Sequence, residues 1–139
     1  MEMLIRLGKG MKVSAEFDNF TIITDQPPED GGDGSAPTPF QLFMAALGTC
    51  AGVYISSFCE QRGISSEEIT INQNMEYEES SDGKMRLARV AMKIIVPEDF
   101  PSKYHNALVK TAELCAVKKV LMNPPLFTIS TIVGPGKAQ

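Results

Sequence analysis

Three cysteine thiols are the side chains of this chain best suited to chemistry. Cys50 and Cys59 lie nine residues apart within one apolar stretch, and Cys115 follows much later in the sequence. On a helix, nine residues turn the chain by about 900° and advance it by about 13.5 Å. Cys50 and Cys59 would therefore point to opposite faces, too far apart for a disulfide or a shared metal. Only the tertiary fold can bring Cys115 close to either of them.

Other uses of the cysteines find less support in the sequence. An odd number of cysteines and the lack of a CxxC pair argue against a disulfide scaffold, a zinc ribbon and a thioredoxin-like site. The single histidine, His105, would lie about 80° away from Cys115 around a helix, so a Cys–His nucleophile pair is not indicated and we expect His105 to be exposed. We expect no metal and no organic cofactor. Because free cysteine is among the most buried residue types, three cysteines that merely fill the core remain an alternative.

Composition limits the class of protein. The 139 residues fit a single domain over residues 1–139, with a net charge of −4 and 43% hydrophobic residues. No cluster of Lys and Arg suggests a nucleic-acid partner. The first residues, MEMLIRLGKGMKV, lack the apolar core of a signal peptide, so we expect a cytoplasmic location in which cysteines stay reduced.

One uncharged stretch, from Phe40 to Cys59, is about long enough to cross a bilayer. It also contains Gln41, Gly48 and several hydroxyl side chains. A helix buried on most of its surface fits this pattern better than a membrane span, and we expect no membrane partner.

The start and the end of this helix can be read from the sequence. Thr38 is suited to be the N-cap, Pro39 the first helical residue, and Gln41 the partner of Thr38 in a capping box. The helix is predicted to run to about Arg62, with Gly63 as its C-cap. Small side chains would let a sheet or a second subunit approach closely: Ala45, Ala46, Gly48, Ala51 and Gly52.

Strands are predicted on both sides of this helix. The first twenty-five residues alternate like a hairpin or a three-stranded meander, with a tight turn at Asp18–Asn19, and residues 26–37 form a loop rich in Gly, Pro and acids. A long hairpin follows, with a turn at residues 80–83. Its buried faces are expected to carry Ile69, Ile71, Met75 and Tyr77 on one strand, and Ala88, Val90, Met92, Ile94 and Val96 on the other.

The remaining residues predict a second helix and a last strand. The helix begins near Pro101–Ser102, carries Cys115, continues or kinks through Leu121 and ends at residues 123–125. Phe127, Ile129, Thr131 and Val133 alternate as a final strand. The predicted order β-β-β-α-β-β-α-β is α+β, an antiparallel sheet with helices on one side and a long buried central helix.

Two segments resemble the cysteine motifs of a known family. APTPFQLFMAALGTCAG resembles the first motif of the OsmC/Ohr family of thiol-dependent hydroperoxide reductases, which place a cysteine in the middle of a long central helix. AELCAVKKVL, followed by a Phe-Thr-Ile-Ser strand, resembles the second motif. The order of elements matches as well, so the resemblance covers nearly the whole chain.

The resemblance implies a fold, an activity and a role for each cysteine. It implies an intertwined homodimer with its central helices back to back. Cys50 would be the peroxidatic cysteine, which reduces an organic hydroperoxide and becomes a sulfenic acid, and Cys115 would be the resolving cysteine, which forms a disulfide with it. An external dithiol, often a lipoyl-bearing protein in this family, would reduce that disulfide. Cys59 matches no motif and is interpreted as structural.

The chain departs from the family in how the reactive thiol is activated. Cys50 lies about three turns into its helix, where the helix dipole stabilises a thiolate little and apolar burial opposes it. Relatives use an Arg held by a Glu ten residues before the cysteine, and here that position is Phe40. The cations that could substitute are Arg6, Lys9 and Lys12, and the acids are Glu29, Asp30 and Asp33.

Two other functions stay open on the sequence. The first is a non-peroxidase protein that binds an apolar ligand in a pocket lined by Phe40, Phe43 and Tyr54. The second is a sulfur-handling or redox-sensing protein that uses Cys50 and Cys115 for thiol exchange.

Overall fold

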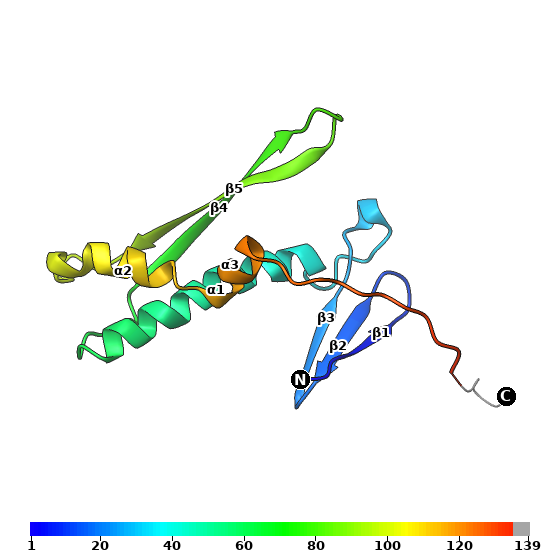
Figure 1. Cartoon of the computed structure of the whole chain (residues 1–139), viewed down its shortest axis with the longest axis horizontal. Coiled ribbons are helices and arrows are strands. Elements are labelled where there is room, and N and C mark those ends of the chain that lie inside the picture. The colour runs from blue at the N-terminus through cyan, green and yellow to red at the C-terminus, as the bar shows by residue number, and fades with distance from the viewer. Residues whose placement is uncertain (135–139) are drawn as a thin grey trace.

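Two antiparallel sheets are joined by a long helix that runs through the middle of the molecule (Figure 1). The structure, a computed structural model, describes residues 1–134, and the predicted α+β class is confirmed. The elements are β1 Leu4–Leu7, β2 Val13–Phe17, β3 Phe20–Thr24, the 3-10 turn Pro28–Asp30, α1 Pro39–Glu60, β4 Thr70–Glu79, β5 Met85–Ile95, the 3-10 turn Ser102–Tyr104, α2 His105–Ala112 and α3 Ala116–Met122.

The ends of α1 carry the predicted caps. The hydroxyl of Thr38 accepts the N–H of Gln41 at 3.2 Å, and the Gln41 side chain accepts the N–H of Thr38 at 2.9 Å. The regular helix ends at Glu60, slightly before the predicted end. Gly63 has a φ of 64°, and its N–H donates to the carbonyl of Glu60. The N–H of Ile64 donates to the carbonyl of Cys59. This left-handed glycine closes the helix as predicted.

One face of α1 is buried and the other is open. By length and composition alone the helix could cross a membrane, with a mean hydropathy of 1.7. In the fold, however, one of its faces packs against α2, α3 and β4. The buried residues on this face are Met44, Leu47, Ala51, Ile55, Phe58 and Cys59. The opposite face is uncovered within this chain, since the side chain of Val53 is 68% exposed.

The hydrophobic core lies between the C-terminal half of α1, α2 and the base of the hairpin. Its buried side chains are Ile55, Phe58, Cys59, Phe100 and Leu108. Burial of such side chains is the main favourable term in folding, and this cluster fixes α2 on α1.

The N-terminal strands form the predicted meander. β2 pairs with β1 on one side and with β3 on the other, both antiparallel. Asp18 adopts a φ of 48° in the tight turn between β2 and β3. The side chains of Asp and Asn tolerate this left-handed backbone better than bulkier ones, which is why Asp18–Asn19 can reverse the chain there.

Asp25 orders the loop of residues 26–37. It is 1% exposed, and its carboxylate accepts the N–H groups of Gln26, Asp33 and Ser35 together with the Ser35 hydroxyl, at 2.7–3.2 Å. These bonds, those from Ser35 above all, outweigh desolvation and lower the pKa of Asp25 from 3.8 to about 2. Within this loop, Gly32 lies so close to Gln26 that an added Cβ would stand 1.9 Å from the Gln26 carbonyl oxygen.

The hairpin differs from the predicted pattern beyond its middle. Ile71 pairs with Ile94, but the register shifts between Glu76 and Tyr77, so that Tyr77 pairs with Leu87. The prediction that Ala88 shares the buried face is therefore wrong. Ala88 is the extra residue of this β-bulge, so Leu87 takes the position opposite Tyr77 that was predicted for Ala88.

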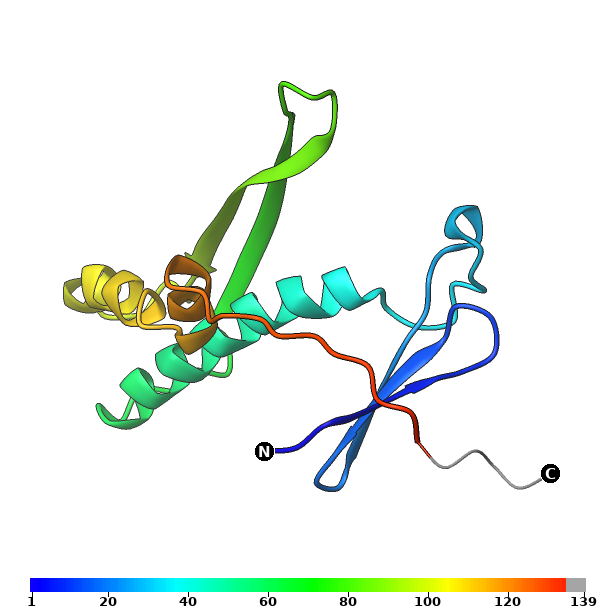
Figure 2. The same ribbon diagram turned by 45° about the vertical axis from the view of Figure 1, so that its right-hand side comes forward.

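The second predicted helix is broken, and the predicted last strand does not pair. A turn after α2 separates it from α3, and Cys115 is the N-cap of α3 rather than a residue within a helix. The predicted strand through Phe127 and Val133 runs as an exposed, extended segment (Figures 1 and 2). The meander and the hairpin also form two separate sheets, which corrects the prediction of one sheet. A strand forms its ladder hydrogen bonds only beside a free sheet edge, and the segment through Phe127 and Val133 pairs with none of the described strands.

We expect Asp25→Asn to destabilise the protein at neutral pH, because an amide oxygen cannot replace a carboxylate that accepts four hydrogen bonds. Since folding lowers the pKa of Asp25, its contribution is present above pH 4 and is lost as the pH falls from about 4 to about 2. Urea unfolding of both proteins at several pH values tests this, with the exposed Asp30→Asn as control. A gap between Asp25→Asn and wild type that stays constant from pH 7 to pH 2 would contradict it.

Candidate active site

Cys50 and Cys115 come together where α3 contacts α1. Figures 1 and 2 show α3 lying against α1. α1 presents Cys50, which is partly exposed, and the turn before α3 presents Cys115, which is 2% exposed. Both are free thiols, and each shifts the pKa of the other. The fold therefore brings together the two cysteines singled out in the sequence.

The sulfur of Cys115 has a defined set of neighbours. It accepts the backbone N–H of Lys118 at 3.4 Å, as an N-cap side chain does, and the thiol lies 3.8 Å from the carbonyl oxygen of Leu47, to which it can donate. Burial raises the pKa of Cys115, and the neighbouring Cys50 adds to the increase. Cys115 is thus held as a neutral thiol.

The pKa of Cys50 moves in the opposite direction. The backbone N–H of Val117 is the main cause of its lowering, followed by a hydrogen bond from the Cys115 thiol. Burial opposes these contacts, and the backbone N–H of Ala116 adds to them. Hydrogen bonds to the charged form of a group favour that form, so the start of α3 stabilises a thiolate on Cys50.

The two thiols consequently have different roles in one pair. The pKa of Cys50 is lowered, which favours its thiolate, while the pKa of Cys115 is raised, which favours its neutral thiol. A thiolate beside a neutral thiol is the arrangement needed for nucleophilic attack followed by disulfide formation.

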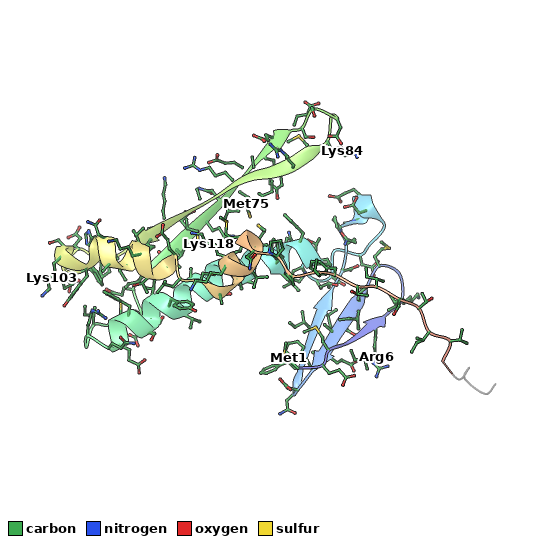
Figure 3. The ribbon with its side chains drawn as sticks, in the orientation of Figure 1. Met1, Arg6, Met75, Lys84, Lys103 and Lys118 are labelled. Atoms are coloured by element: carbon green, nitrogen blue, oxygen red, sulfur yellow. The ribbon has the colours of Figure 1, made fainter. Side chains whose placement is uncertain are left out.

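The basic residues considered as activators lie elsewhere in this chain. Arg6 pairs with Glu16 at 3.0 Å, and Lys12 pairs with Asp33 at 2.7 Å. Lys9 is an exposed turn residue. Figure 3 shows Arg6 on the N-terminal meander, whereas Lys118 lies over the middle of α1. Within residues 1–134, the contacts that lower the pKa of Cys50 come from the backbone N–H groups of Val117 and Ala116 and from Cys115, and none comes from a basic side chain.

The remaining candidates take no part in the thiol pair. Phe40 packs against Phe43 with 6.0 Å between ring centres, and Glu29 and Asp30 are exposed. His105 is exposed, as predicted, and stacks on Phe100. No group of three or more His, Cys, Asp or Glu side chains suited to a metal occurs in the part of the chain that the structure describes.

Cys59 is separated from the pair, as the helical spacing required. It is fully buried in the core, and desolvation raises its pKa. A buried thiol of this kind is unreactive, which agrees with a packing role.

Gln73 fixes the hairpin against α1 next to Cys50. Its side-chain amide donates to the carbonyl of Met44 at 3.0 Å, and its buried oxygen lies 2.9 Å from where a Cβ on Gly48 would stand. The small residue at position 48 therefore lets a strand approach the helix half a turn before the reactive thiol.

An apolar cavity of about 480 Å³ lies beside the thiol pair, between α1, the hairpin, α2 and α3. Cys115 is among its lining residues and Cys50 is not. The prediction that Phe40, Phe43 and Tyr54 line the pocket is wrong for this cavity, since none of the three is among its lining residues. The cavity is lined by Leu47, Ala51, Ile71, Val90, Met92, Ile94, Val96, His105, Leu108, Val109, Ala112, Glu113, Cys115, Lys118 and Leu121.

Comparisons with known proteins agree with this arrangement. The family described as OsmC-like protein matches residues 32–130, a span that includes both cysteines. A solved osmotic stress induced and detoxification response protein from Psychrobacter arcticus is similar, with 23% identity, a TM-score of 0.71 and coverage of 84% of this chain and 85% of that one.

Two further solved structures share the fold. An OsmC-like protein from Mycoplasma pneumoniae has 13% identity, a TM-score of 0.70 and coverage of 88% and 87%. An organic hydroperoxide resistance protein from Legionella pneumophila has 22% identity, a TM-score of 0.61 and coverage of 87% and 89%. The search of curated proteins gave no match.

The pKa shifts of the two thiols can be tested by titration. We expect Cys50 to ionise below the ordinary range of a free thiol and Cys115 above it. Cys115→Ala should raise the pKa of Cys50, because it removes one donor, but should not abolish the shift, because Val117 and Ala116 still donate. Thiolate absorbance at 240 nm, read from pH 4 to pH 11, gives the curves.

Cys59→Ala is the control for this titration and should leave the first ionisation unchanged. If the first thiolate were to form only above the ordinary range and were unaffected by Cys115→Ala, the assignment of Cys50 as the ionised partner would be wrong.

Proposed function

The chain belongs to the OsmC-like protein family, and on that basis we propose that it is a thiol-dependent peroxidase that reduces organic hydroperoxides. The observation that carries the proposal is the pairing of Cys50, whose pKa is lowered, with Cys115, whose pKa is raised. Two cysteines that only filled the core would both be expected to have raised values, as Cys59 has.

The first step is attack by Cys50 on the peroxide. Its thiolate sulfur bonds to the terminal oxygen of the hydroperoxide, the O–O bond breaks, and the alkoxide leaves and takes a proton to become an alcohol. Cys50 is then a sulfenic acid. The N–H groups of Val117 and Ala116, which lower the pKa of Cys50, favour the thiolate that this attack requires.

The second step is condensation of the two cysteines. The sulfur of Cys115 bonds to the sulfur of Cys50, the S–O bond breaks, and water leaves with the proton of the Cys115 thiol. Each cysteine shifts the pKa of the other, which supports two sulfurs that are near enough to join. An external dithiol in a reducing cytoplasm would then restore both thiols.

Organic hydroperoxides are favoured as substrates over hydrogen peroxide. The side chains around the thiol pair are largely apolar, and apolar surface binds a carbon chain better than it binds a small polar molecule. Solved structures of the same fold include proteins named for organic hydroperoxide resistance, which supports the same class.

The working molecule is proposed to be an intertwined homodimer. A folded monomer of this mass exposes about 7,100 Å², whereas this chain exposes 11232 Å². The excess is in the range of a large permanent interface. Much of it is apolar side chains of the C-terminal segment, such as Leu126, Phe127 and Ile129, and of the open face of α1.

A second function is favoured by the cavity itself. Its volume of about 480 Å³ and its apolar lining suit a small apolar ligand, so a binding role without peroxidase chemistry is the alternative. In that case the thiols would be incidental to the function.

Reaction with cumene hydroperoxide distinguishes these functions. One equivalent added to reduced protein should consume two thiols and remove two hydrogen atoms from the intact mass. Cys115→Ser should stop at the sulfenic acid, which dimedone traps on Cys50, and Cys50→Ser should not react. Cys59→Ala is the control and should behave like wild type. If Cys50→Ser reacts as fast as wild type, the peroxidase proposal fails.

Sedimentation tests the dimer. The 15.2 kDa chain should sediment at twice its mass at micromolar concentration. Val53→Glu, which places a charge on the open face of α1, should weaken the dimer, whereas Lys110→Glu on the exposed side of α2 should not. A monomer at all concentrations would contradict the dimer.

A further inference from the structure

The apolar cavity reaches one sulfur of the thiol pair and not the other. Cys115 is part of its lining, together with Leu47 and Ala51 of α1 and Leu121 of α3. Cys50 is not among its lining residues and is partly exposed. Of the two sulfurs, the cavity therefore gives a small molecule access to that of Cys115.

Resting on the peroxidase function above, we propose that the dithiol that reduces the Cys50–Cys115 disulfide enters this cavity and attacks the sulfur of Cys115, not that of Cys50. The reductant then forms its mixed disulfide with Cys115, and Cys50 is released first.

The chemistry of the leaving group favours the same direction. When a thiolate of the reductant bonds to the sulfur of Cys115, the bond between the two cysteines breaks and its electron pair stays on Cys50. A thiol with a lower pKa leaves a disulfide faster, and the Val117 and Ala116 N–H groups lower the pKa of Cys50. Attack at Cys50 would instead expel Cys115 as a buried thiolate, whose pKa is raised.

The second half of the reaction releases the reductant. The second thiol of the reductant loses its proton and attacks the reductant sulfur that is bonded to Cys115. This forms a disulfide within the reductant and breaks the mixed disulfide, and Cys115 leaves and takes up the proton. In balance, one dithiol and one protein disulfide give two protein thiols and one oxidised reductant.

The cavity also indicates what kind of reductant fits. Its volume of about 480 Å³ is in the range of sites for small molecules, and its interior side chains are almost all apolar. The polar lining residues His105, Glu113 and Lys118 have exposed side chains and so stand at its opening. An unbranched aliphatic dithiol with a polar end that stays in water matches this lining.

Trapping the mixed disulfide identifies the attacked sulfur. The disulfide is prepared with diamide, so its formation does not depend on any peroxide activity, and is mixed with one equivalent of 6-mercapto-1-hexanol. Acid quenching, labelling with N-ethylmaleimide and peptide mass mapping at early times follow. We expect the hexanol group on Cys115 and the maleimide on Cys50. The reverse labelling overturns the proposal, and so does failure of diamide to link the two cysteines.

A pair of neighbouring substitutions tests the route. Leu121 lines the cavity and is 46% exposed, whereas Val120 is 54% exposed and lies outside it. Leu121→Trp should slow attack by 6-mercapto-1-hexanol by about tenfold and attack by 2-mercaptoethanesulfonate, which has no apolar chain, much less. Val120→Trp should match wild type with both thiols. Equal rates in the two variants overturn the proposed route.

The peroxidase function can fail separately from this inference. If the protein is inert to cumene hydroperoxide but carries the hexanol group on Cys115 after diamide treatment, the cavity route is supported and the proposed substrate is contradicted. If the protein reacts with the peroxide but carries the hexanol group on Cys50, the proposed substrate is supported and the cavity route is contradicted.

Discussion

The contact between the start of α3 and the middle of α1 is the one on which the chemistry of this protein depends. Thiolate formation at Cys50 needs positive potential in largely apolar surroundings, where desolvation alone would raise the pKa. The turn between α2 and α3 supplies this positive potential, because it starts a new helix. Residues that begin a helix have backbone N–H groups with no partner inside that helix. Ala116 and Val117 direct two such groups at Cys50. Lys118 directs a third at Cys115, so one turn of helix serves both sulfurs.

The same contact makes the two thiols unequal and couples them to the rest of the fold. Cys115 is buried because it caps α3 inside the space between α1 and the hairpin, and burial keeps it protonated. Cys50 lies at the edge of that space and is open to solvent on one side. The hairpin contacts α1 through Gln73, whose side chain lies close to Gly48. A shift of the hairpin would therefore change the cavity and the contact of α3 with α1 together.

Sequence patterns were sufficient for the elements that depend on local chemistry. The capping box at Thr38, the left-handed Gly63 and the turn at Asp18 each depend on a side chain or a glycine that is visible in the sequence, and all lie where predicted. The pairing of Cys50 with Cys115 could be suggested only by resemblance, since no spacing rule joins residues so far apart. The activating groups could not be predicted, because every residue except proline has a backbone N–H and only the break before Ala116 makes these available. The bulge at Glu76–Tyr77 was missed for a similar reason, since alternation of side chains does not reveal an inserted residue.

Within residues 1–134, the pairing of Arg6 and Lys12 away from Cys50 can be understood from this geometry. A Glu at position 40 would be useful only if it held an Arg near Cys50, and in this chain Arg6 and Lys12 are already paired with Glu16 and Asp33. With backbone donors in place, Cys50 can ionise without an added charge, and Phe40 is free to pack against Phe43. Fixed N–H dipoles stabilise a thiolate less than a full charge does, but they need no second side chain to hold them in place. Such a site activates the thiol less strongly, but the fold itself maintains its geometry. This suits Cys50, which is proposed to form and break a disulfide with Cys115, the N-cap of α3.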